Sequence, residues 1–145
     1  MKIRDMADTD VESVVALWER CGLTRPWNDV RQDIAFCRSG PASTALVAEE
    51  HGRVAAALLV GHDGHRGTVY YVGTDPDRRG RGIGKAIMAA AEDWLRRHGV
   101  WKLNLLVREG NDAAVGFYRA LGYGDQGCVV LGKRLDGLED RRPRA

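Results

Sequence analysis

The chain has 145 residues, enough for one domain with one sizeable hydrophobic core. Hydrophobic residues make up 44% and charged residues 29%, a balance typical of folded globular proteins that excludes a disordered chain. Lysine and arginine total 22 against 20 acidic residues, and a net charge of +2 argues against a nucleic-acid-binding protein.

The chain order begins with a short strand and two helices. Residues 2–4 fit a strand, and the helix that follows has Thr9 and Glu12 at the spacing of a capping box. A loop at residues 23–28 leads to a second, short helix at residues 29–37. The first residues contain no apolar segment of the signal-peptide kind, so we expect no signal peptide.

Three strands follow and predict an antiparallel meander. They span residues 44–49, 54–61 and 68–74, and polar turns at residues 50–53 and 62–67 separate them. Three consecutive alanines at residues 55–57 weaken the middle strand, because alanine has low strand propensity.

The second half alternates helix and strand. Its expected elements are a helix at 82–98, a strand at 102–107, a helix at 111–121, an irregular strand region at 123–135 and a frayed polar tail at 136–145. The order predicts an α/β fold with a mixed sheet in a single domain, residues 1–135. No apolar run approaches the roughly 20 residues of a membrane span, so we expect no membrane partner.

The cysteines indicate the compartment. Cys21, Cys37 and Cys128 are odd in number and lack metal-ligand spacing, so we expect free thiols and no metal. Free thiols are typical of a reducing compartment, and we therefore expect a cytoplasmic protein.

One motif stands out, DPDRRGRGIGKA at residues 75–86. Its glycines occupy alternate positions directly before a strong helix-forming run. A Walker A loop does not fit, because Ala86 replaces the required hydroxyl residue, and a dinucleotide fingerprint fails because Lys85 replaces its third glycine.

The physical properties of this motif still predict a diphosphate site. The first amides of a helix lack partners within the helix, and glycines let an anion approach them closely. The helix dipole and the charges of Arg78, Arg79, Arg81 and Lys85 add attraction. The alternative is a glycine-rich turn with surface arginines.

Two stretches resemble the GNAT superfamily of N-acetyltransferases. Residues 79–84 match its Q/R-x-x-G-x-G/A motif, and residues 74–80 resemble the approach V-x-P-x-x-R-G. Residues 111–118, with Gly122 and Tyr123, resemble its motif N-x-x-A-x-x-hydrophobic-Y-x-x-x-G-aromatic. Two motifs in the family's order are much more specific than one.

The resemblance extends to a branch of the family and implies a fold and an activity. Residues 23–29 and 61–67 resemble small bacterial, YpeA-like members. The implied GNAT fold has a twisted mixed sheet, splayed between its fourth and fifth strands and flanked by about four helices. The implied reaction moves the acetyl group of acetyl-CoA to a primary amine by direct attack in a ternary complex. The acceptor would be a small molecule, a peptide N-terminus or a lysine.

The resemblance also implies roles for residues. It implies that acetyl-CoA is bound by Val72, Gly73, Thr74, Arg79, Gly80, Arg81, Gly82, Ile83, Gly84, Lys85, Asn111 and Tyr118. The backbone N–H of Val72 would be the oxyanion donor, and Tyr118 the general acid on the leaving thiolate. Tyr118 could instead only pack beside Phe117, and Asn111 could be only a helix cap. Gly73 is consistent with a bulge or a close approach.

The general base and the acceptor pocket each have several candidate residues. Many family members carry a glutamate on the fourth strand where this chain has Tyr71. The base candidates are therefore His65, Asp63, Glu109, or a water relayed by Tyr70 or Tyr71. For substrate binding we expect Trp27, Tyr70 and Tyr71, although Trp27 could equally be a loop anchor. The other tryptophans, Trp18, Trp94 and Trp101, are expected in the core.

Two rival classes stay open. The basic motif could be the arm of a nucleic-acid binder, which would lose affinity steeply with salt. The missing strand glutamate also permits a catalytically weak acyl-CoA-binding sensor or interaction protein. For the enzyme, we expect an amine acceptor and no nucleic-acid partner, in a monomer or homodimer.

Overall fold

The structure is a computed structural model that describes residues 1–139. The chain forms two compact units, Met1–Leu106 and Val107–Ala145. Within residues 1–139, the first unit contains the sheet and three α-helices, and the second contains one α-helix.

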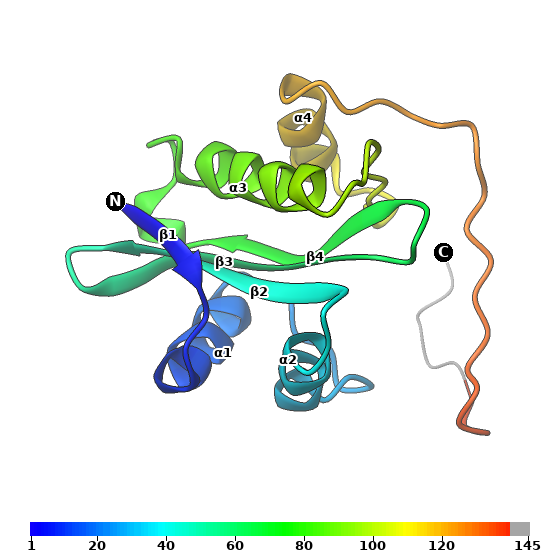
Figure 1. The fold of residues 1–145 in the computed structure, drawn as a ribbon, viewed down its shortest axis with the longest axis horizontal. Coiled ribbons are helices and arrows are strands. Elements are labelled where there is room, and N and C mark those ends of the chain that lie inside the picture. The colour runs from blue at the N-terminus through cyan, green and yellow to red at the C-terminus, as the bar shows by residue number, and fades with distance from the viewer. Residues whose placement is uncertain (140–145) are drawn as a thin grey trace. The chain divides into compact units, whose positions relative to one another are not determined.

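The sheet of the first unit is an antiparallel meander. Its strands are β1 (Lys2–Asp5), β2 (Ser43–Glu50), β3 (Arg53–His62) and β4 (Gly67–Thr74), in the spatial order β1-β2-β3-β4 (Figure 1). His51 and Gly52 form the β2–β3 turn with φ of 52° and 74°, a pair of positive values typical of tight hairpin turns. The predicted three-strand meander is confirmed.

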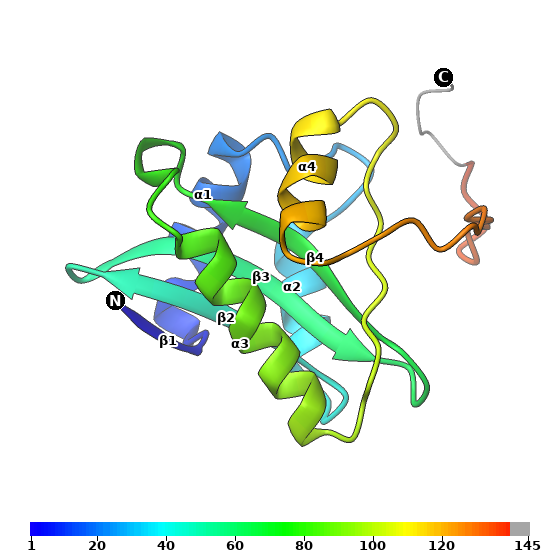
Figure 2. The same ribbon diagram turned by 90° about the horizontal axis from the view of Figure 1, so that it is seen from above.

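Helices cover both faces of this sheet. α1 (Val11–Arg20) and α2 (Val30–Arg38) lie on one face, and α3 (Ile83–Arg97) lies on the other (Figures 1 and 2). The core on the α1 face includes Trp18 and Ile34. The alanines at 55–57 are 0% exposed, because the middle strand is covered from both sides and small side chains fit there. Burial therefore overrides their low strand propensity.

The start of α1 differs from the prediction. A short 3-10 turn, Asp8–Asp10, precedes the helix, and the Asp10 carboxylate accepts the N–H of Ala7 at 2.8 Å. The predicted capping box of Thr9 and Glu12 is wrong, because the Glu12 carboxylate instead pairs with Arg31 at 2.6 Å. The Arg4 guanidinium donates to both oxygens of Asp10, at 2.6 Å to Oδ2 and 3.1 Å to Oδ1, and anchors β1 to this turn.

The predicted strand at 102–107 is reduced to one parallel bridge. Gly67 N–H donates to the Lys102 carbonyl and Asn104 N–H donates to the Gly67 carbonyl, each at 2.9 Å. Within the described residues no further ladder joins this segment to β4. The parallel part of the mixed sheet is therefore this bridge, and beyond it the two segments line a groove instead of pairing.

The second unit contains α4 (Asp112–Ala120), as predicted. Asn111 caps it, with its side-chain oxygen accepting the N–H of Ala114 at 3.2 Å, and Gly122 follows its end with φ of 96°. Residues 123–135 form no strand in the described part of this unit, which corrects the prediction. A strand needs a paired edge, and this unit supplies none among its described residues. Of the predicted tail at 136–145, residues 140–145 lie outside the described residues.

Two general features follow from the described residues. No helix within residues 1–139 is both long enough and apolar enough to span a membrane. Across the same residues, Cys21, Cys37 and Cys128 are free of disulfides, as predicted.

Candidate active site

The start of α3 is built for an anion. Gly80 and Gly82 have φ of 80° and 77°, left-handed values that glycine adopts without strain. The first helical bond runs from Ala86 N–H to the Gly82 carbonyl at 3.0 Å. Within the described chain no side chain caps this start and its first turn has no acidic residue, so the preceding amides are free for a ligand.

The other helices make the contrast clear. Asp29 caps α2 through the N–H of Gln32, and Asn111 caps α4. At α3, a Cβ placed on Gly80 or Gly82 would meet no described atom within 4 Å. The space in front of these amides is therefore open, and the helix dipole adds positive potential there.

The basic residues around this start divide into two kinds. Arg79, Arg81 and Lys85 are exposed and can reach an anion, and Arg81 also lies 3.6 Å from the Glu50 carboxylate. Arg78 instead donates to Glu50 at 2.7 Å and lies 3.7 Å from the Asp75 carboxylate. The expectation that Arg78 adds charge for a ligand is therefore corrected, because its charge is neutralised in holding the loop to the β2–β3 turn.

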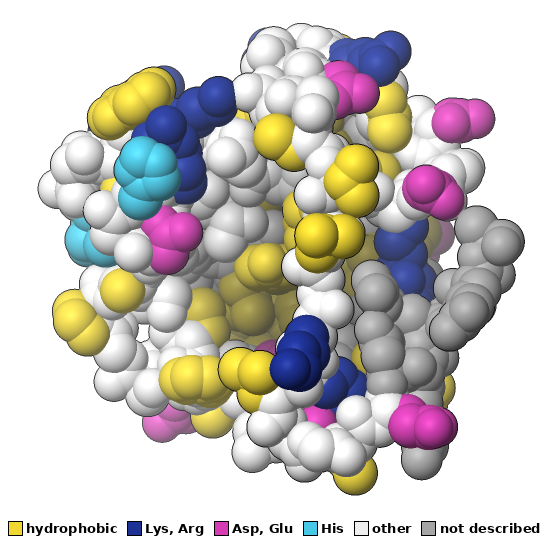
Figure 3. All heavy atoms as spheres, turned by 90° about the vertical axis from the view of Figure 1, so that its right-hand side faces the viewer, with side chains coloured by type: hydrophobic (Ala, Val, Ile, Leu, Met, Phe, Trp, Pro, Cys, Tyr) yellow, Lys and Arg dark blue, Asp and Glu magenta, His cyan; other side chains and the backbone are white. Residues whose placement is uncertain are grey.

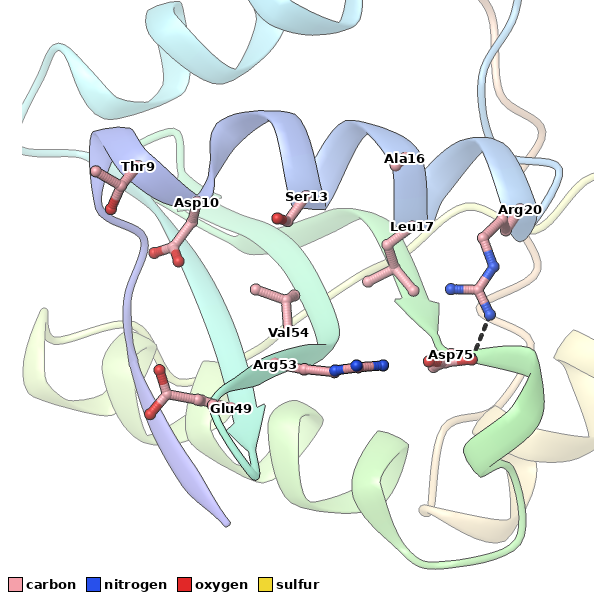
Figure 4. Close-up of a pocket in the computed structure, with 11 residues that line it drawn as sticks. Thr9, Asp10, Ser13, Ala16, Leu17, Arg20, Glu49, Arg53, Val54 and Asp75 are labelled. Carbon is pink, nitrogen blue, oxygen red and sulfur yellow. Dashed lines mark hydrogen bonds and ion pairs between the residues drawn. The ribbon is translucent and has the colours of Figure 1, made fainter.

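Asp75 joins the loop to the end of α1. Its carboxylate accepts the N–H of Asp77 and the guanidinium of Arg20, the latter at 2.7 Å (Figure 4). The Asp77 N–H, followed by Arg20, lowers the pKa of Asp75. The hollow drawn in Figure 4, about 520 Å³, is lined by this Arg20–Asp75 pair together with Asp10, Glu49, Arg53 and uncharged residues. We interpret the Arg20–Asp75 pair as a contact that holds the loop in place.

β4 carries a bulge next to this loop in the chain. Leu59 pairs with Tyr70 and Ala57 with Gly73, so Tyr71 and Val72 together face the single residue Leu58. Tyr71 has φ of +54°, which is rare for a residue with a side chain. Bulges leave a residue out of the hydrogen-bond ladder and bend the strand. The Val72 region is thus the irregular point of β4.

Gly73 is required by its neighbours. A Cβ at Gly73 would lie 3.0 Å from Cδ1 of Leu23, 3.1 Å from Cδ1 of Trp18 and 3.2 Å from the sulfur of Cys21. Side chains of α1 and of the residues after it therefore pack closely on Gly73, and its contact with acetyl-CoA stays a prediction. Cys21 also donates its S–H to the Thr74 carbonyl at 3.2 Å, and burial raises the pKa of its thiol.

The side chain of Tyr71 is held between two elements. Its ring stacks on Trp18, with ring centroids 4.6 Å apart and planes at 20°. Its hydroxyl donates to Oδ2 of Asp33 on α2 at 2.7 Å. Burial, and then the Asp33 carboxylate, raise the pKa of Tyr71 well above its usual 10, so the hydroxyl remains a donor at physiological pH.

Tyr71 and Asp33 line a groove of about 790 Å³. α2 and the loop before it contribute Asn28, Asp33 and Phe36; β4 contributes Tyr70 and Tyr71; the segment after α3 contributes Asn104 and Leu106. Phe36 is 81% exposed and Tyr70 50% exposed, so the wall offers apolar surface to a ligand. An open groove with apolar walls and few polar groups is typical of small-ligand sites.

The β3–β4 turn forms one end of this groove. Asp63, His62 and Arg66 line it, while His65 is exposed, and the Asp63 carboxylate accepts the N–H groups of His65 and Arg66. Figure 3 shows histidine side chains beside basic ones on this side of the molecule. The Arg66 guanidinium lies 4.3 Å from the ring centroid of Trp101.

The tryptophans correct one expectation. Trp101 is 77% exposed, so its predicted place in the core is wrong, whereas Trp18 and Trp94 are buried as predicted. The segment that carries Trp101 meets the sheet at the isolated Gly67–Leu103 bridge, so the Trp101 ring lies outside the sheet. The Arg66 guanidinium packs on this ring. Trp27 is half-buried in the α1–α2 loop, next to the groove residue Asn28.

The second unit holds the remaining predicted residues, Glu109, Asn111 and Tyr118. The half-buried Tyr118 ring makes edge contacts with Phe117 and Tyr123, with centroids 5.0 and 5.9 Å apart. Burial raises the pKa of Tyr118, which favours the protonated phenol. Asn111 has a structural role as the cap of α4.

Asp33 is the site residue that sequence reasoning missed. Its helix was predicted, but nothing local marks Asp33 among the polar residues of that helix. The available signal was indirect, since Tyr71 stands where the resemblance leads one to expect a glutamate, and a carboxylate can come from a neighbouring element instead. The Asp33 carboxylate lies 2.7 Å from the Tyr71 hydroxyl.

Comparison with known proteins decides the family. The sequence pattern of the Acetyltransferase (GNAT) family matches residues 7–123, from before α1 to the end of the second motif. An acetyltransferase of Pectobacterium atrosepticum is 46% identical over 141 residues, which cover 97% of this chain and 99% of that protein. The chain belongs to the GNAT family of acetyltransferases.

Solved GNAT structures share its fold. AAC(6')-Iy, in complex with the bisubstrate analogue CoA-S-monomethyl-acetylneamine, gives a TM-score of 0.78 at 19% identity and covers 92% of this chain and 97% of that one. The ribosomal-protein-S18-alanine N-acetyltransferase from Escherichia coli gives 0.70 at 25% identity, covering 83% and 76%. The predicted GNAT fold is confirmed, and this GNAT protein is an acetyl-CoA-dependent N-acetyltransferase.

Proposed function

We propose that this GNAT acetyltransferase binds the diphosphate of acetyl-CoA at the start of α3 and passes the acetyl group directly to a primary amine in the groove beside β4. The observation that carries the proposal is the open, glycine-bordered start of α3. It follows the bulged strand β4 in the chain after one short loop, so the anion site and the bulge belong to one local unit.

The residues present fit coenzyme A. A diphosphate suits the amides of residues 82–85, with Arg79, Arg81 and Lys85 supplying charge. The pantetheine arm would lie along Val72, Gly73 and Thr74. Asn111 and Tyr118 are assigned to the same ligand by the second motif. Acetyl-CoA supplies the acetyl group as a thioester with a thiolate leaving group.

The chain's own groups then act on the reacting atoms. The backbone N–H of Val72, at the bulge, would donate to the thioester oxygen as negative charge develops on it. The Tyr118 hydroxyl would protonate the leaving sulfur, and its raised pKa keeps it protonated for this role. Cys21 has its thiol pKa raised by burial, which disfavours a thiolate nucleophile and supports direct transfer to the amine.

The acceptor is an amine on a small molecule, a peptide N-terminus or a lysine. Trp27, Tyr70 and Tyr71 are the proposed contacts, and Tyr70 and Tyr71 line the groove. A lysine amine has a pKa near 10.4 and an α-amine near 8, so the acceptor must lose a proton before attack. His65 and Glu109 stay base candidates. We further propose a cytoplasmic monomer or homodimer that needs no metal, nucleic acid or membrane.

A product assay tests this function. The purified protein is incubated with acetyl-CoA and a panel of amines, polyamines and peptides, and products are identified by mass spectrometry. We expect an N-acetylated product that accumulates with an equal amount of free coenzyme A. Acetyl-CoA binding without product from any amine would favour the sensor. Salt-sensitive DNA binding without acetyl-CoA affinity would favour the nucleic-acid binder.

A further inference from the structure

We infer that Asp33, held by Tyr71, is the anchor for the acceptor's ammonium group, and that the acceptor is a cationic primary amine carrying an apolar arm. This inference rests on the proposed function, because it names the substrate class of the same groove. Three observations on the described residues support it. The Asp33 carboxylate has an oxygen available, Tyr71 fixes the orientation of this carboxylate, and the surface beside it is apolar.

The Asp33 carboxylate faces the groove with one oxygen available. Its Oδ2 accepts the Tyr71 hydroxyl at 2.7 Å, and among the described residues Oδ1 accepts no hydrogen bond. An ammonium donates up to three hydrogen bonds and forms its strongest ones with a carboxylate. Oδ1 can therefore receive a ligand cation while Tyr71 keeps the carboxylate in place, and the bound ammonium passes one proton to a base before its nitrogen attacks the thioester.

Tyr71 is well placed to fix that orientation. Its ring is stacked on the fully buried Trp18, and its backbone is part of the β4 bulge. Tyr71 directly precedes Val72, the proposed oxyanion donor. Asp33 contacts the Tyr71 side chain, and Tyr71 is the neighbour of Val72 in the chain. A cation bound by Asp33 would therefore lie close to the place where the acetyl group is expected. Tyr71 is a positioning residue in this account.

The other charged groups of the groove favour a cation. The β3–β4 turn contributes His62, Asp63 and Arg66. The Asp63 carboxylate already accepts two backbone N–H groups, and the Arg66 guanidinium stacks on Trp101. The groove thus has two carboxylates and one arginine. Asp63 is exposed, and both of its hydrogen bonds fall on Oδ1, whereas Asp33 is half-buried, fixed by the Tyr71 hydroxyl and next to the apolar wall, so we take Asp33 as the carboxylate that receives the ligand.

The surface next to Asp33 specifies the rest of the acceptor. Phe36 is one turn further along α2, and Tyr70 precedes Tyr71 on β4; both rings are largely exposed and line the groove with Leu106. Such walls favour an alkyl or aromatic arm over a highly charged one. An arylalkyl amine such as 2-phenylethylamine combines the two required parts.

Direct binding tests the inference without relying on turnover. The protein is saturated with coenzyme A and titrated calorimetrically with 2-phenylethylamine and with its neutral counterpart, 2-phenylethanol. We expect the amine to bind at least 10-fold more tightly. Equal binding of amine and alcohol, or no binding of the amine, would overturn the inference, and this comparison needs no variant.

Variants locate the interaction. Asp33→Asn keeps the shape and an acceptor for Tyr71 but removes the charge, and it should weaken amine binding about 10- to 100-fold. Tyr71→Phe keeps the stacked ring and should weaken it less. Asp93→Asn, on the outer surface of α3, is the matched control and should change nothing.

The outcomes separate the two proposals. With an accepted amine, Asp33→Asn should raise the acceptor KM far more than it lowers kcat, while the Kd of acetyl-CoA stays constant. Unchanged KM and unchanged amine affinity in Asp33→Asn would refute the anchor, although acetyl transfer would still be established. Tight amine binding without any acetylated product would instead refute the proposed function and leave the anchor standing.

Discussion

Replacing Gly82 with aspartate should nearly abolish acetyl-CoA binding while leaving the fold intact. Gly82 is the residue before α3, with φ of 77° and open space where a Cβ would point. Aspartate tolerates this left-handed backbone better than most residues and is a good helix cap. The variant should therefore keep its melting temperature, and any loss of binding is local.

The expected loss can be worked from charge. For a carboxylate at residue 82 we take a distance of about 6 Å to each charge of a bound diphosphate as the input to Coulomb's law. At an effective dielectric constant of about 40, each repulsion costs about 1.4 kcal/mol, and two give about 3 kcal/mol. The new side chain also obstructs the close approach that glycine permits. We therefore expect a Kd about 100-fold higher.

Two further variants isolate the cause. Gly82→Asn has the same size without the charge, so its Kd should rise much less. Gly99→Asp lies beyond the other end of α3, with a similar φ of 79° and no described atom within 4 Å of the new Cβ, so acetyl-CoA affinity should not change. Titration calorimetry measures all three. An unchanged Kd in Gly82→Asp would refute the placement of the diphosphate.

Three other predictions concern catalysis, packing and pH. Tyr118→Phe should lower kcat about 100-fold at saturating acetyl-CoA with little change in its Kd, whereas a ratio near one would exclude the general-acid role. Gly73→Ala should destabilise the protein by about 1–3 kcal/mol in urea unfolding, because its Cβ would press on Trp18 and the end of α1; an unchanged midpoint would contradict this packing. Asp10→Asn should cost about 1–3 kcal/mol at pH 7, because it removes the nearer of the two carboxylates that pair with Arg4 and leaves only Glu49. Arg4 lowers the pKa of Asp10 below its usual 3.8, so the wild type loses this advantage as the pH falls below that value, and a stability gap that stays constant down to pH 2.5 would disprove it.

Local sequence signals predicted much of the fold. Glycines at the ends of helices and polar turns between strands mark boundaries that the structure confirms, including Gly82, Gly99 and Gly122. The anion site was readable for the same reason, since it is made of consecutive residues whose backbone does the binding.

Contacts between distant segments could not be read in this way. Asp33 reaches Tyr71 across 38 positions, and nothing in its own helix indicates the pairing. Trp101 was expected in the core because it lies on a helix or strand face, but among the described residues its segment has one bridge to the sheet, and its ring is exposed beside Arg66. The predicted strand at 123–135 failed similarly, because a strand depends on a partner edge that local sequence does not reveal.

Direct transfer between two bound substrates is tested most directly by initial rates measured over a matrix of acetyl-CoA and amine concentrations. A ternary complex predicts double-reciprocal lines that intersect, and a protein that remains unacetylated when incubated with acetyl-CoA alone. Parallel lines, together with an acetyl group found by mass spectrometry on Cys21 or Cys37, would show a covalent intermediate and contradict direct attack by the amine.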